Sequence, residues 1–252
     1  MLIIPENIWK QIEHLIPQKK SAVGRPQKDR KLTLSAIFYL LKEGCSWHGL
    51  PDYYGKPTTI HGRFRQWIKD GVFNEIFFTS IKSAISKYGE PECFYTDTTS
   101  IKAPHANFGG KNPTDRKKNG VKKSIVCDKN RVVLSLLISS ANTHDVNLLI
   151  PHLENLTQYV KTNNPKVMIT DSAWDSEKIR SALAKENIAL LAATNPRRDK
   201  HKKKYSPSGR WVIEQIFGIL HWKRGIKFCW TKTKESFLSL SLLACSAYNF
   251  QL

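Results

Sequence analysis

The spacing of apolar residues along the chain changes near residue 90. Before that point apolar residues recur three or four positions apart, as they do on one face of a helix. This spacing predicts four helices: one that ends at Pro17, one over residues 32–43, one from a cap at Thr58 or Thr59 to Lys69, and one over residues 72–88. Residues 1–90 are therefore expected to form an all-α domain.

After Gly89 short apolar and β-branched segments replace the helical pattern. They predict strands at residues 92–97, 122–128, 131–140, 166–171 and 188–194, and helices at residues 145–161 and 175–186. Three strands joined by short turns, followed by alternating strands and helices, predict a mixed five-stranded sheet flanked by helices. Residues 91–252 are thus expected to form a second domain, of the α/β class.

The net charge of the chain indicates which class of molecule it binds. Forty Lys and Arg against 21 Asp and Glu give a net charge of +19 and a pI near 9.8. Such a field attracts polyanions, so nucleic acid is the expected partner. The basic residues are spread over several elements rather than gathered on one amphipathic helix, which argues against a membrane surface.

Targeting signals and cysteines indicate the compartment. The apolar start of the chain is too short for a secretory signal, and no run reaches the length of a membrane span. The five cysteines form no C-x-x-C pair and fit neither a disulfide framework nor a zinc site. The sequence predicts a cytoplasmic, nucleoid-associated protein without membrane contact.

Two predicted strands end in the same Thr-Asp dipeptide. Asp97 follows one apolar strand and Asp171 follows another. Ligand sites in sheets of this kind gather at the carboxyl ends of strands, so a divalent ion is expected between these two carboxylates. The alternative is that each Asp only caps a turn or a helix.

A third acid is expected on a helix near residues 208–221. Ser208 is the predicted cap of this helix. Arg210, Glu214 and His221 fall within roughly 40° of one another around it. Glu214 is therefore the candidate third ligand, and the alternative is a surface ion pair between Arg210 and Glu214.

Three carboxylates suit displacement at a phosphodiester. Two Mg²⁺ ions about 4 Å apart stabilise the attacking and the leaving oxygen together, and Mg²⁺ is held by carboxylates, water and phosphate. The eight histidines are scattered and show no zinc-binding spacing.

Segments spread over nearly the whole chain occur in a characteristic order: IPENIWKQIEHLIP, LTLSAIFYLLKEGCSWHGLP, TTIHGRFRQWIKDGVF, YTDTTSIKA, ISSANTHDVNLL, ITDSAWDSEKIRSAL and RWVIEQIFGIL. In content and order they resemble the DDE transposases of bacterial insertion sequences, in particular the branch of the insertion sequence four and five groups. The resemblance implies an RNase H-like core with Asp97, Asp171 and Glu214 as the metal-binding triad. It implies cleavage of a DNA strand at the element end and attack of the freed 3′-hydroxyl on target DNA. Two Mg²⁺ ions are the implied cofactor, for which Mn²⁺ can substitute, and the implied partners are double-stranded DNA and a second copy of the chain in a homodimer.

The sequence departs from the signature of this branch, Y-x2-R-x3-E-x6-K, at two positions. Pro207 stands where the signature has Tyr, and His221 stands where it has Lys. In the family these two residues are associated with a flipped base and with phosphate near the scissile bond. Tyr205 lies two residues too early, and Lys223 lies on about the opposite helical face from Glu214. A neutral imidazole holds phosphate less well than an ammonium, so one interpretation is reduced activity, and the other is that Tyr205 and Lys223 reach the site from altered geometry.

Basic residues in three places are candidates for DNA contact. The run at residues 196–204 is interpreted as a strap over phosphates, with a solvated loop as the alternative. The helix TTIHGRFRQWIK is interpreted as the recognition helix of a helix-turn-helix, with a plain packing or dimerisation module as the alternative. The candidates are Arg63, Arg65, Arg197, Arg198, Lys202, Lys203, Lys204, Arg210, Lys223 and Arg224.

Other polar and aromatic residues have two interpretations each. Possible supporting residues around the acids are His144, Asp145, Tyr205 and His221. Asp145 and Asp175 are more simply explained as helix starts. Three tryptophans are candidates for base stacking, although buried packing is expected for most of them: Trp174, Trp222 and Trp230.

Three functions remain compatible with the sequence. The favoured one is a Mg²⁺-dependent transposase acting on the inverted ends of its own element. A noncatalytic DNA-binding relative that keeps the fold and the basic surface is the second. A Mg²⁺-dependent nuclease or resolvase on the same core is the third, and it would cut DNA without joining strands.

Overall fold

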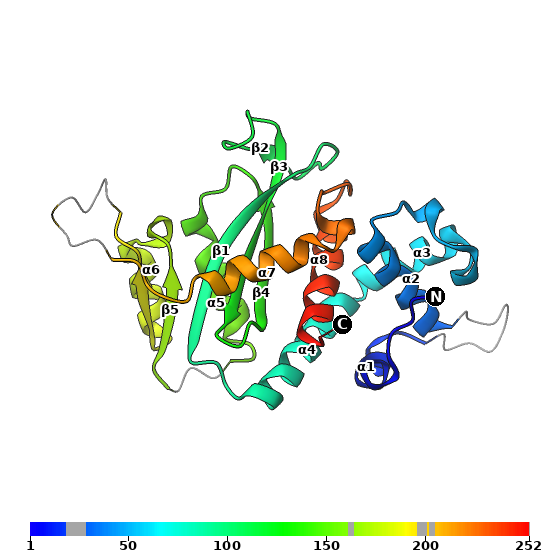
Figure 1. Ribbon diagram of the computed structural model, residues 1–252, viewed down its shortest axis with the longest axis horizontal. Helices are drawn as coiled ribbons and strands as arrows, with labels where there is room; N and C mark the ends of the chain where they lie inside the picture. Colours follow the sequence, from blue (N-terminus) through cyan, green and yellow to red (C-terminus); the bar gives the residue numbers. More distant parts are fainter. Residues whose placement is uncertain (19–28, 161–163, 196–200, 202–204, 252) are drawn as a thin grey trace.

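The computed structural model describes residues 1–18, 29–160, 164–195, 201 and 205–251 (Figure 1). Its α-helices are α1 (Glu6–Ile12), α2 (Arg30–Glu43), α3 (Pro57–Lys69), α4 (Val72–Tyr88), α5 (Leu149–Leu156), α6 (Glu177–Lys185), α7 (Trp211–His221) and α8 (Lys234–Asn249). Short 3-10 helices are η1 (Glu13–Leu15), η2 (Trp47–Gly49), η3 (Asp52–Tyr54), η4 (Asp145–Leu148), η5 (Ser172–Trp174) and η6 (Arg224–Ile226). Within these ranges no helix is both long enough and apolar enough to cross a membrane.

The N-terminal helices form where the apolar spacing predicts them. The Asp29 carboxylate caps α2 by accepting from the backbone N–H groups of Lys31 and Leu32, and Gly44 ends it in the left-handed conformation. The predicted cap of α3 is wrong. The helix begins at Pro57, whose fixed φ suits the first turn, and no side chain caps it.

The connection between α2 and α3 is too long for a simple helix-turn-helix. It runs over residues 44–56 and contains η2 and η3. The turn of a helix-turn-helix usually has three or four residues, so α2 and α3 do not form its simplest version. A DNA-reading role for α3 stays a prediction.

One sheet contains the strands of the described residues. They are β1 (Cys93–Lys102), β2 (Gly110–Lys111), β3 (Asn119–Asp128), β4 (Val133–Ser140), β5 (Lys166–Thr170) and β6 (Ile188–Ala192). β4 and β1 flank β3 as antiparallel neighbours, and β5 and β6 continue parallel to β1. This arrangement of five main strands is RNase H-like, which confirms the predicted fold. The sixth strand, β2, pairs only with the start of β3 and is too short to leave a hydrophobic pattern.

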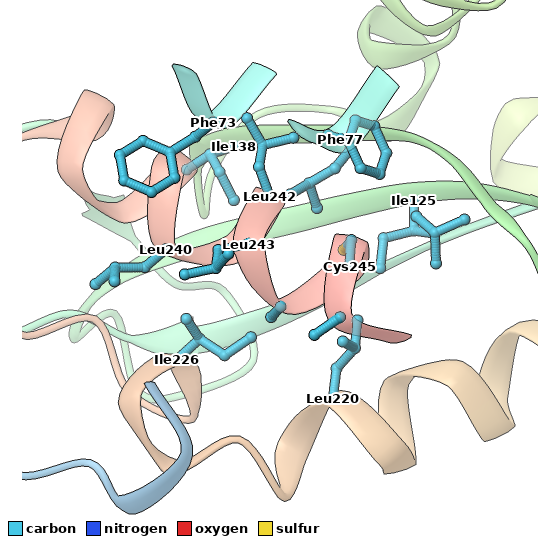
Figure 2. Packing of buried hydrophobic residues seen from close by; sticks show 14 of the residues in the cluster. Phe73, Phe77, Ile125, Ile138, Leu220, Ile226, Leu240, Leu242, Leu243 and Cys245 are labelled. Atoms are coloured by element: carbon cyan, nitrogen blue, oxygen red, sulfur yellow. The ribbon is translucent and has the colours of Figure 1, made fainter. Parts of the chain in front are cut away.

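Helices cover both faces of the sheet. Ile125 of β3 faces α7 and α8, and Figure 2 shows α8 residues between Phe73 and Phe77 of α4 and Leu220 of α7. On the opposite face α5 is tied to the sheet by His152, whose ring nitrogens lie 2.7 Å from Ser124 Oγ and 2.8 Å from Ser135 Oγ. Because α8 packs on α4 as well as on β4, the N-terminal helices and the sheet share one continuous core.

Three predicted helix starts are wrong, two of them for the same reason. α5 is preceded by η4 and is shorter than expected, and Asp145 caps neither. Ser176 rather than Asp175 caps α6, and α7 follows Arg210 rather than a Ser208 cap. Both aspartates are instead engaged in ion pairs, with Lys122 and Arg180 respectively. An acid before an apolar run predicts a cap only when no cation competes for it.

A lysine is buried beneath α8. Lys123 of β3 is 1% exposed, and its Nζ donates to the Ile226 carbonyl at 3.2 Å. Burial lowers the pKa of Lys123 to about 8, although the nearby Cys245 and Cys229 thiols act in the opposite direction. At neutral pH the fold therefore holds a desolvated ammonium.

We expect Lys123→Met to stabilise the protein at pH 7 by about 2 kcal/mol, because the desolvation cost is removed and only one hydrogen bond is lost. Between about pH 8 and 10.5 the unfolded chain holds a proton on Lys123 that the folded chain lacks. The free energy of unfolding contributed by this group thus rises with pH over that window, and the advantage of the variant should shrink. Urea unfolding of both proteins at pH 7 and pH 10 measures this; a gap that is constant with pH would contradict it.

Candidate active site

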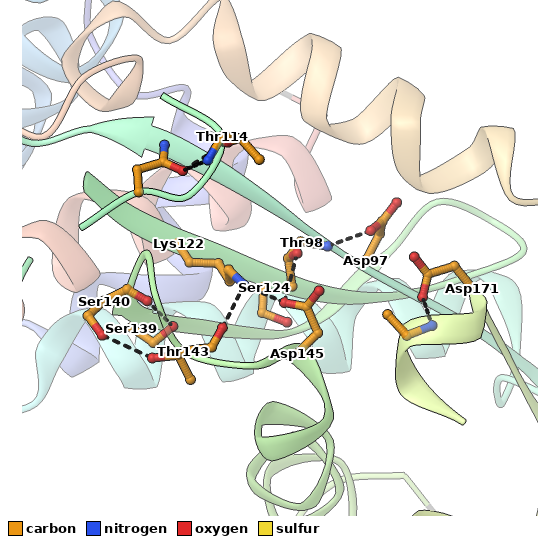
Figure 3. Close-up of polar contacts among 12 residues, drawn as sticks. Asp97, Thr98, Thr114, Lys122, Ser124, Ser139, Ser140, Thr143, Asp145 and Asp171 are labelled. Atoms are coloured by element: carbon orange, nitrogen blue, oxygen red, sulfur yellow. Dashed lines mark hydrogen bonds and ion pairs between the residues drawn. The ribbon is translucent and has the colours of Figure 1, made fainter. Parts of the chain in front are cut away.

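Two aspartates come together where the pairing of β1 with β5 stops: Asp171 directly follows β5, whereas Asp97 lies within β1, which continues to Lys102. Tyr95 of β1 is in register with Ile169 of β5, so Asp97 and Asp171 lie two positions further along in matching places. Asp171 follows the last residue of β5, and its Oδ1 accepts from the Ala173 N–H at 2.9 Å. Figure 3 shows both carboxylates on the same side of the strands, with α7 passing nearby. The structure thus brings the two residues together, but the predicted strand end at Asp97 is wrong, because β1 continues to Lys102 as the antiparallel partner of β3.

The Asp97 carboxylate is held in a partly buried position. Its Oδ1 accepts from the backbone N–H of Thr98 at 2.7 Å, and the side chain is 23% exposed. Burial raises the pKa of Asp97, and the neighbouring Asp171 carboxylate raises it further. The Thr98 N–H and the Arg210 guanidinium lower it. Two carboxylates that repel each other in a partly desolvated place form a site that a cation would stabilise.

The start of α7 packs directly against β1. Gly209 has a φ of +88°, and a Cβ on it would lie 2.7 Å from the Tyr95 hydroxyl. The chain therefore approaches β1 closely just before the helix, which brings Arg210 Nη2 to 3.5 Å from Asp97 Oδ2. The ion pair formed by Arg210 is thus with Asp97. No ion pair between Arg210 and Glu214 occurs among the described residues.

Glu214 lies on the same helix as Arg210 but is exposed. It is four residues further on, about 6 Å along the helix axis. Within the described ranges, no group of three His, Cys, Asp or Glu side chains is close enough to hold a metal ion. The structure thus unites two of the three predicted acids and places the third on α7, the helix that packs against β1.

The donors present fit a hard divalent ion. The Asp97 and Asp171 side chains offer carboxylate oxygens, the ligands that Mg²⁺ prefers. The positive charge beside Asp97 in this structure is the Arg210 guanidinium.

A polar network lies behind Asp97 on the opposite face of β1. Asp145 Oδ1 accepts from Thr98 Oγ1 at 3.2 Å and from Lys122 Nζ at 2.6 Å, and Lys122 also donates to the Thr143 carbonyl at 2.7 Å (Figure 3). Asp145 is thus connected to Asp97 through Thr98 and also raises the pKa of Asp97. His144 is exposed beside this network and lines a cavity of about 220 Å³.

Thr98 and Lys122 are contacts that the sequence interpretation missed. The sequence does contain a signal for these two residues. Both lie on strands at positions whose side chains point to the α5 side of the sheet, and Lys122 is the one charged residue there on β3 before the apolar run.

The predicted DNA-contact residues on α3 and after α7 lie in different surroundings. Arg65 is exposed, whereas Arg63 donates to Thr33 Oγ1 at 3.0 Å. Lys223 is half-buried with its Nζ 4.9 Å from the centroid of the Phe38 ring, so it faces α2 and not the aspartates. Arg224 is largely exposed, with Nη1 4.0 Å from Glu43 Oε2.

Tyr205, which lies two residues before Pro207, and His221, which stands where the signature has Lys, are both exposed. Tyr205 and Thr194 are joined through the Thr194 N–H and the Tyr205 carbonyl at 3.0 Å, and through the Tyr205 N–H and Thr194 Oγ1 at 2.8 Å. Thr194 and Tyr205, which lie on either side of positions 196–204, are thus hydrogen-bonded to each other. Five predicted contacts of that run lie outside the described residues: Arg197, Arg198, Lys202, Lys203 and Lys204. Although His221 is exposed, partial desolvation of its ring and the nearby Lys123 and Lys227 lower its pKa.

The expectation of buried tryptophans holds for one of the three. Trp174 is fully buried, whereas Trp222 is 83% and Trp230 is 59% exposed. Apolar spacing alone does not separate an exposed ring in a turn from a buried one.

Two family models match this chain. Residues 4–77 match a putative transposase of the IS4/5 family, and residues 88–250 match a transposase DDE domain. A putative transposase for insertion sequence element IS402 of Burkholderia cepacia is 31% identical over 144 residues, which are 54% of this chain and 65% of that protein. An uncharacterized 16.2 kDa protein of the same element is 30% identical over 80 residues, 29% of this chain and 54% of that protein.

Two solved transposase structures are among those that resemble this chain at low sequence identity. A piggyBac transposase synaptic complex with hairpin DNA has a TM-score of 0.47 and 9% identity, covering 98% of this chain and 72% of that one. The catalytic domain of Mos1 mariner transposase has a TM-score of 0.32 and 12% identity, covering 70% of this chain and 93% of that one. Because the DDE model spans well over half of the sequence and the IS4/5 model most of the remainder, the chain belongs to the IS4/5 family of DDE transposases.

Proposed function

We propose that this protein is the transposase of an insertion sequence, which binds the inverted ends of the element, cleaves DNA strands there and joins the 3′-hydroxyl to target DNA. The observation that carries the proposal is the pair of Asp97 on β1 and Asp171 just after the neighbouring β5, with α7 against β1. Membership of the DDE family implies dependence on divalent metal ions in general.

Asp97, Asp171 and Glu214 are the residues proposed to hold two Mg²⁺ ions, with Mn²⁺ as a substitute. When bound, such ions stabilise the attacking and leaving oxygens of a phosphodiester displacement. The chain's own contribution is positional. The Thr98 N–H and the Asp145 network orient the Asp97 carboxylate, and the Gly209 turn sets the distance of α7 from β1.

Arg210 is proposed to serve the site in two ways. In this structure its guanidinium lies beside Asp97 and offsets part of the repulsion between the two carboxylates. In a complex with DNA, an arginine in this place is suited to hold a phosphate in a bidentate manner near the acids.

The proposed partners are double-stranded DNA at the element ends and the target, and a second copy of this chain. Residues 1–90 are proposed to bind the ends and residues 91–252 to carry the chemistry, with the run at residues 196–204 contacting phosphates. The net charge of +19 supports a polyanionic partner.

Strand cleavage and joining on DNA that carries the element's ends tests this function. With Mg²⁺ we expect nicked ends and products joined through a 3′-hydroxyl, and with EDTA we expect binding but neither product. Cutting without joining would identify a nuclease or resolvase instead. Binding with no cutting in Mg²⁺ or Mn²⁺ would identify a noncatalytic DNA-binding protein.

A further inference from the structure

Exposed aromatic rings and lysines gather near the C-terminal end of β1. We name His105, Lys227, Phe228, Trp230 and Lys232 the aromatic–basic patch. Trp230 is 59% and Phe228 37% exposed, and the other three residues are also exposed. The Trp230 ring centroid lies 6.1 Å from that of His105 and 6.1 Å from that of Phe228. The patch thus joins two chain segments that are distant in sequence.

The backbone fixes these rings in their outward positions. The Cys229 N–H donates to the Lys102 carbonyl at 2.9 Å, and the Asn107 N–H donates to the Lys232 carbonyl at 3.0 Å. Between Phe228 and Trp230 the Cys229 side chain is fully buried. Because a buried residue separates them in this pinned segment, the two rings are directed away from the core. Exposure of the rings is therefore a consequence of the fold and not of a loose loop.

The charges of the patch have one sign. Among the described residues, neither Lys227 nor Lys232 forms an ion pair with an acidic side chain. Large rings exposed beside unpaired lysines indicate a binding surface rather than a site left over from packing. Stacking platforms flanked by cations are the usual means of holding nucleic-acid strands whose base faces are free.

The patch lies within reach of DNA at the aspartates. Lys102, whose carbonyl anchors Cys229, is five residues after Asp97 on the same strand. This separation is about 17 Å along β1. A strand held at Asp97 and Asp171 needs only a few nucleotides to arrive at Trp230.

We propose that the aromatic–basic patch binds single-stranded DNA by stacking unpaired bases on Trp230 and Phe228, while Lys227 and Lys232 contact the phosphates. Unpaired bases are required because a duplex hides its base faces within the stack. The proposal rests on the proposed function only in taking DNA as the partner. It does not depend on cleavage, since this site and the two aspartates are separate.

Fluorescence anisotropy with the whole 252-residue chain tests the proposal, using labelled oligo(dT) of twenty nucleotides and a duplex of the same length, both in EDTA. We expect Trp230→Ala to weaken oligo(dT) binding about tenfold and to leave duplex binding within twofold. Trp230→Phe keeps a stacking face and should restore most of the affinity. Tyr88→Ala is the matched control, because Tyr88 is 40% exposed and precedes the opposite end of β1.

Three results would overturn the proposal. One is unchanged oligo(dT) affinity for Trp230→Ala with a normal thermal unfolding curve. Another is an equal loss on the duplex, which would show a general DNA contact. The third is that the parent protein elutes as a dimer and Trp230→Ala as a monomer on size exclusion, which would make the patch a protein interface. Failure of the proposed function would appear separately, as absence of Mg²⁺-dependent cleavage with oligo(dT) binding intact.

Discussion

Replacing Asp97 with asparagine is expected to slow metal-dependent strand cleavage by about a thousandfold. The substitution keeps the shape of the side chain and an oxygen that can accept from the Thr98 N–H, but it removes a negative charge beside Asp171. DNA affinity should be retained, because the change removes no cation. Single-turnover cleavage rates and filter-binding constants for the two proteins measure both effects.

Asp175→Asn is the matched control for Asp97→Asn. Asp175 is also a partly buried aspartate in an ion pair, with Arg180 Nη2 at 2.7 Å, and it lies four residues after Asp171. Its substitution should leave the cleavage rate within about threefold, since the role assigned to it is to hold α6. If Asp97→Asn cuts as fast as the parent protein, the aspartates do not hold the catalytic metal.

Glu214→Gln is expected to lower the cleavage rate by a similar factor, about a thousandfold. The test is sharp because Glu214 is exposed and forms no ion pair among the described residues. A surface glutamate in this position would tolerate the change with no measurable effect on rate or stability. We therefore expect Glu214→Gln to lose the cleavage rate and to keep the unfolding temperature of the parent protein, as measured by cleavage assays and thermal unfolding curves.

Glu235→Gln provides the comparison for Glu214→Gln. Glu235 is likewise exposed and lies in the first turn of α8, as Glu214 lies in the first turn of α7. We expect its cleavage rate to stay within twofold of the parent. Equal rates for both glutamine variants would remove Glu214 from the site.

The helices of residues 1–90 could be predicted because their apolar spacing is regular. The strand end at Asp171 also follows from a short apolar segment that ends in Thr-Asp. The same rule is wrong for Asp97, because pairing with β3 extends β1 to Lys102. Asp97 and Asp171 still lie together because the parallel register of β1 and β5 brings them to matching positions.

The partners of charged side chains could not be predicted from spacing. Arg210 and Glu214 have ideal helical spacing for a pair, yet Arg210 contacts Asp97 on a distant strand. Asp145 has the position of a cap but accepts from Lys122. In each case a tertiary contact competes with the local one, and the sequence does not show which side chains the sheet brings close.

Manganese anomalous scattering from crystals of the protein bound to element-end DNA tests the triad most directly. We predict a strong peak between the Asp97 and Asp171 carboxylates, with a Glu214 oxygen at about 2 Å from a bound ion. Anomalous density located elsewhere, or a bound ion from which Glu214 points away, would contradict the proposed arrangement of the three acids.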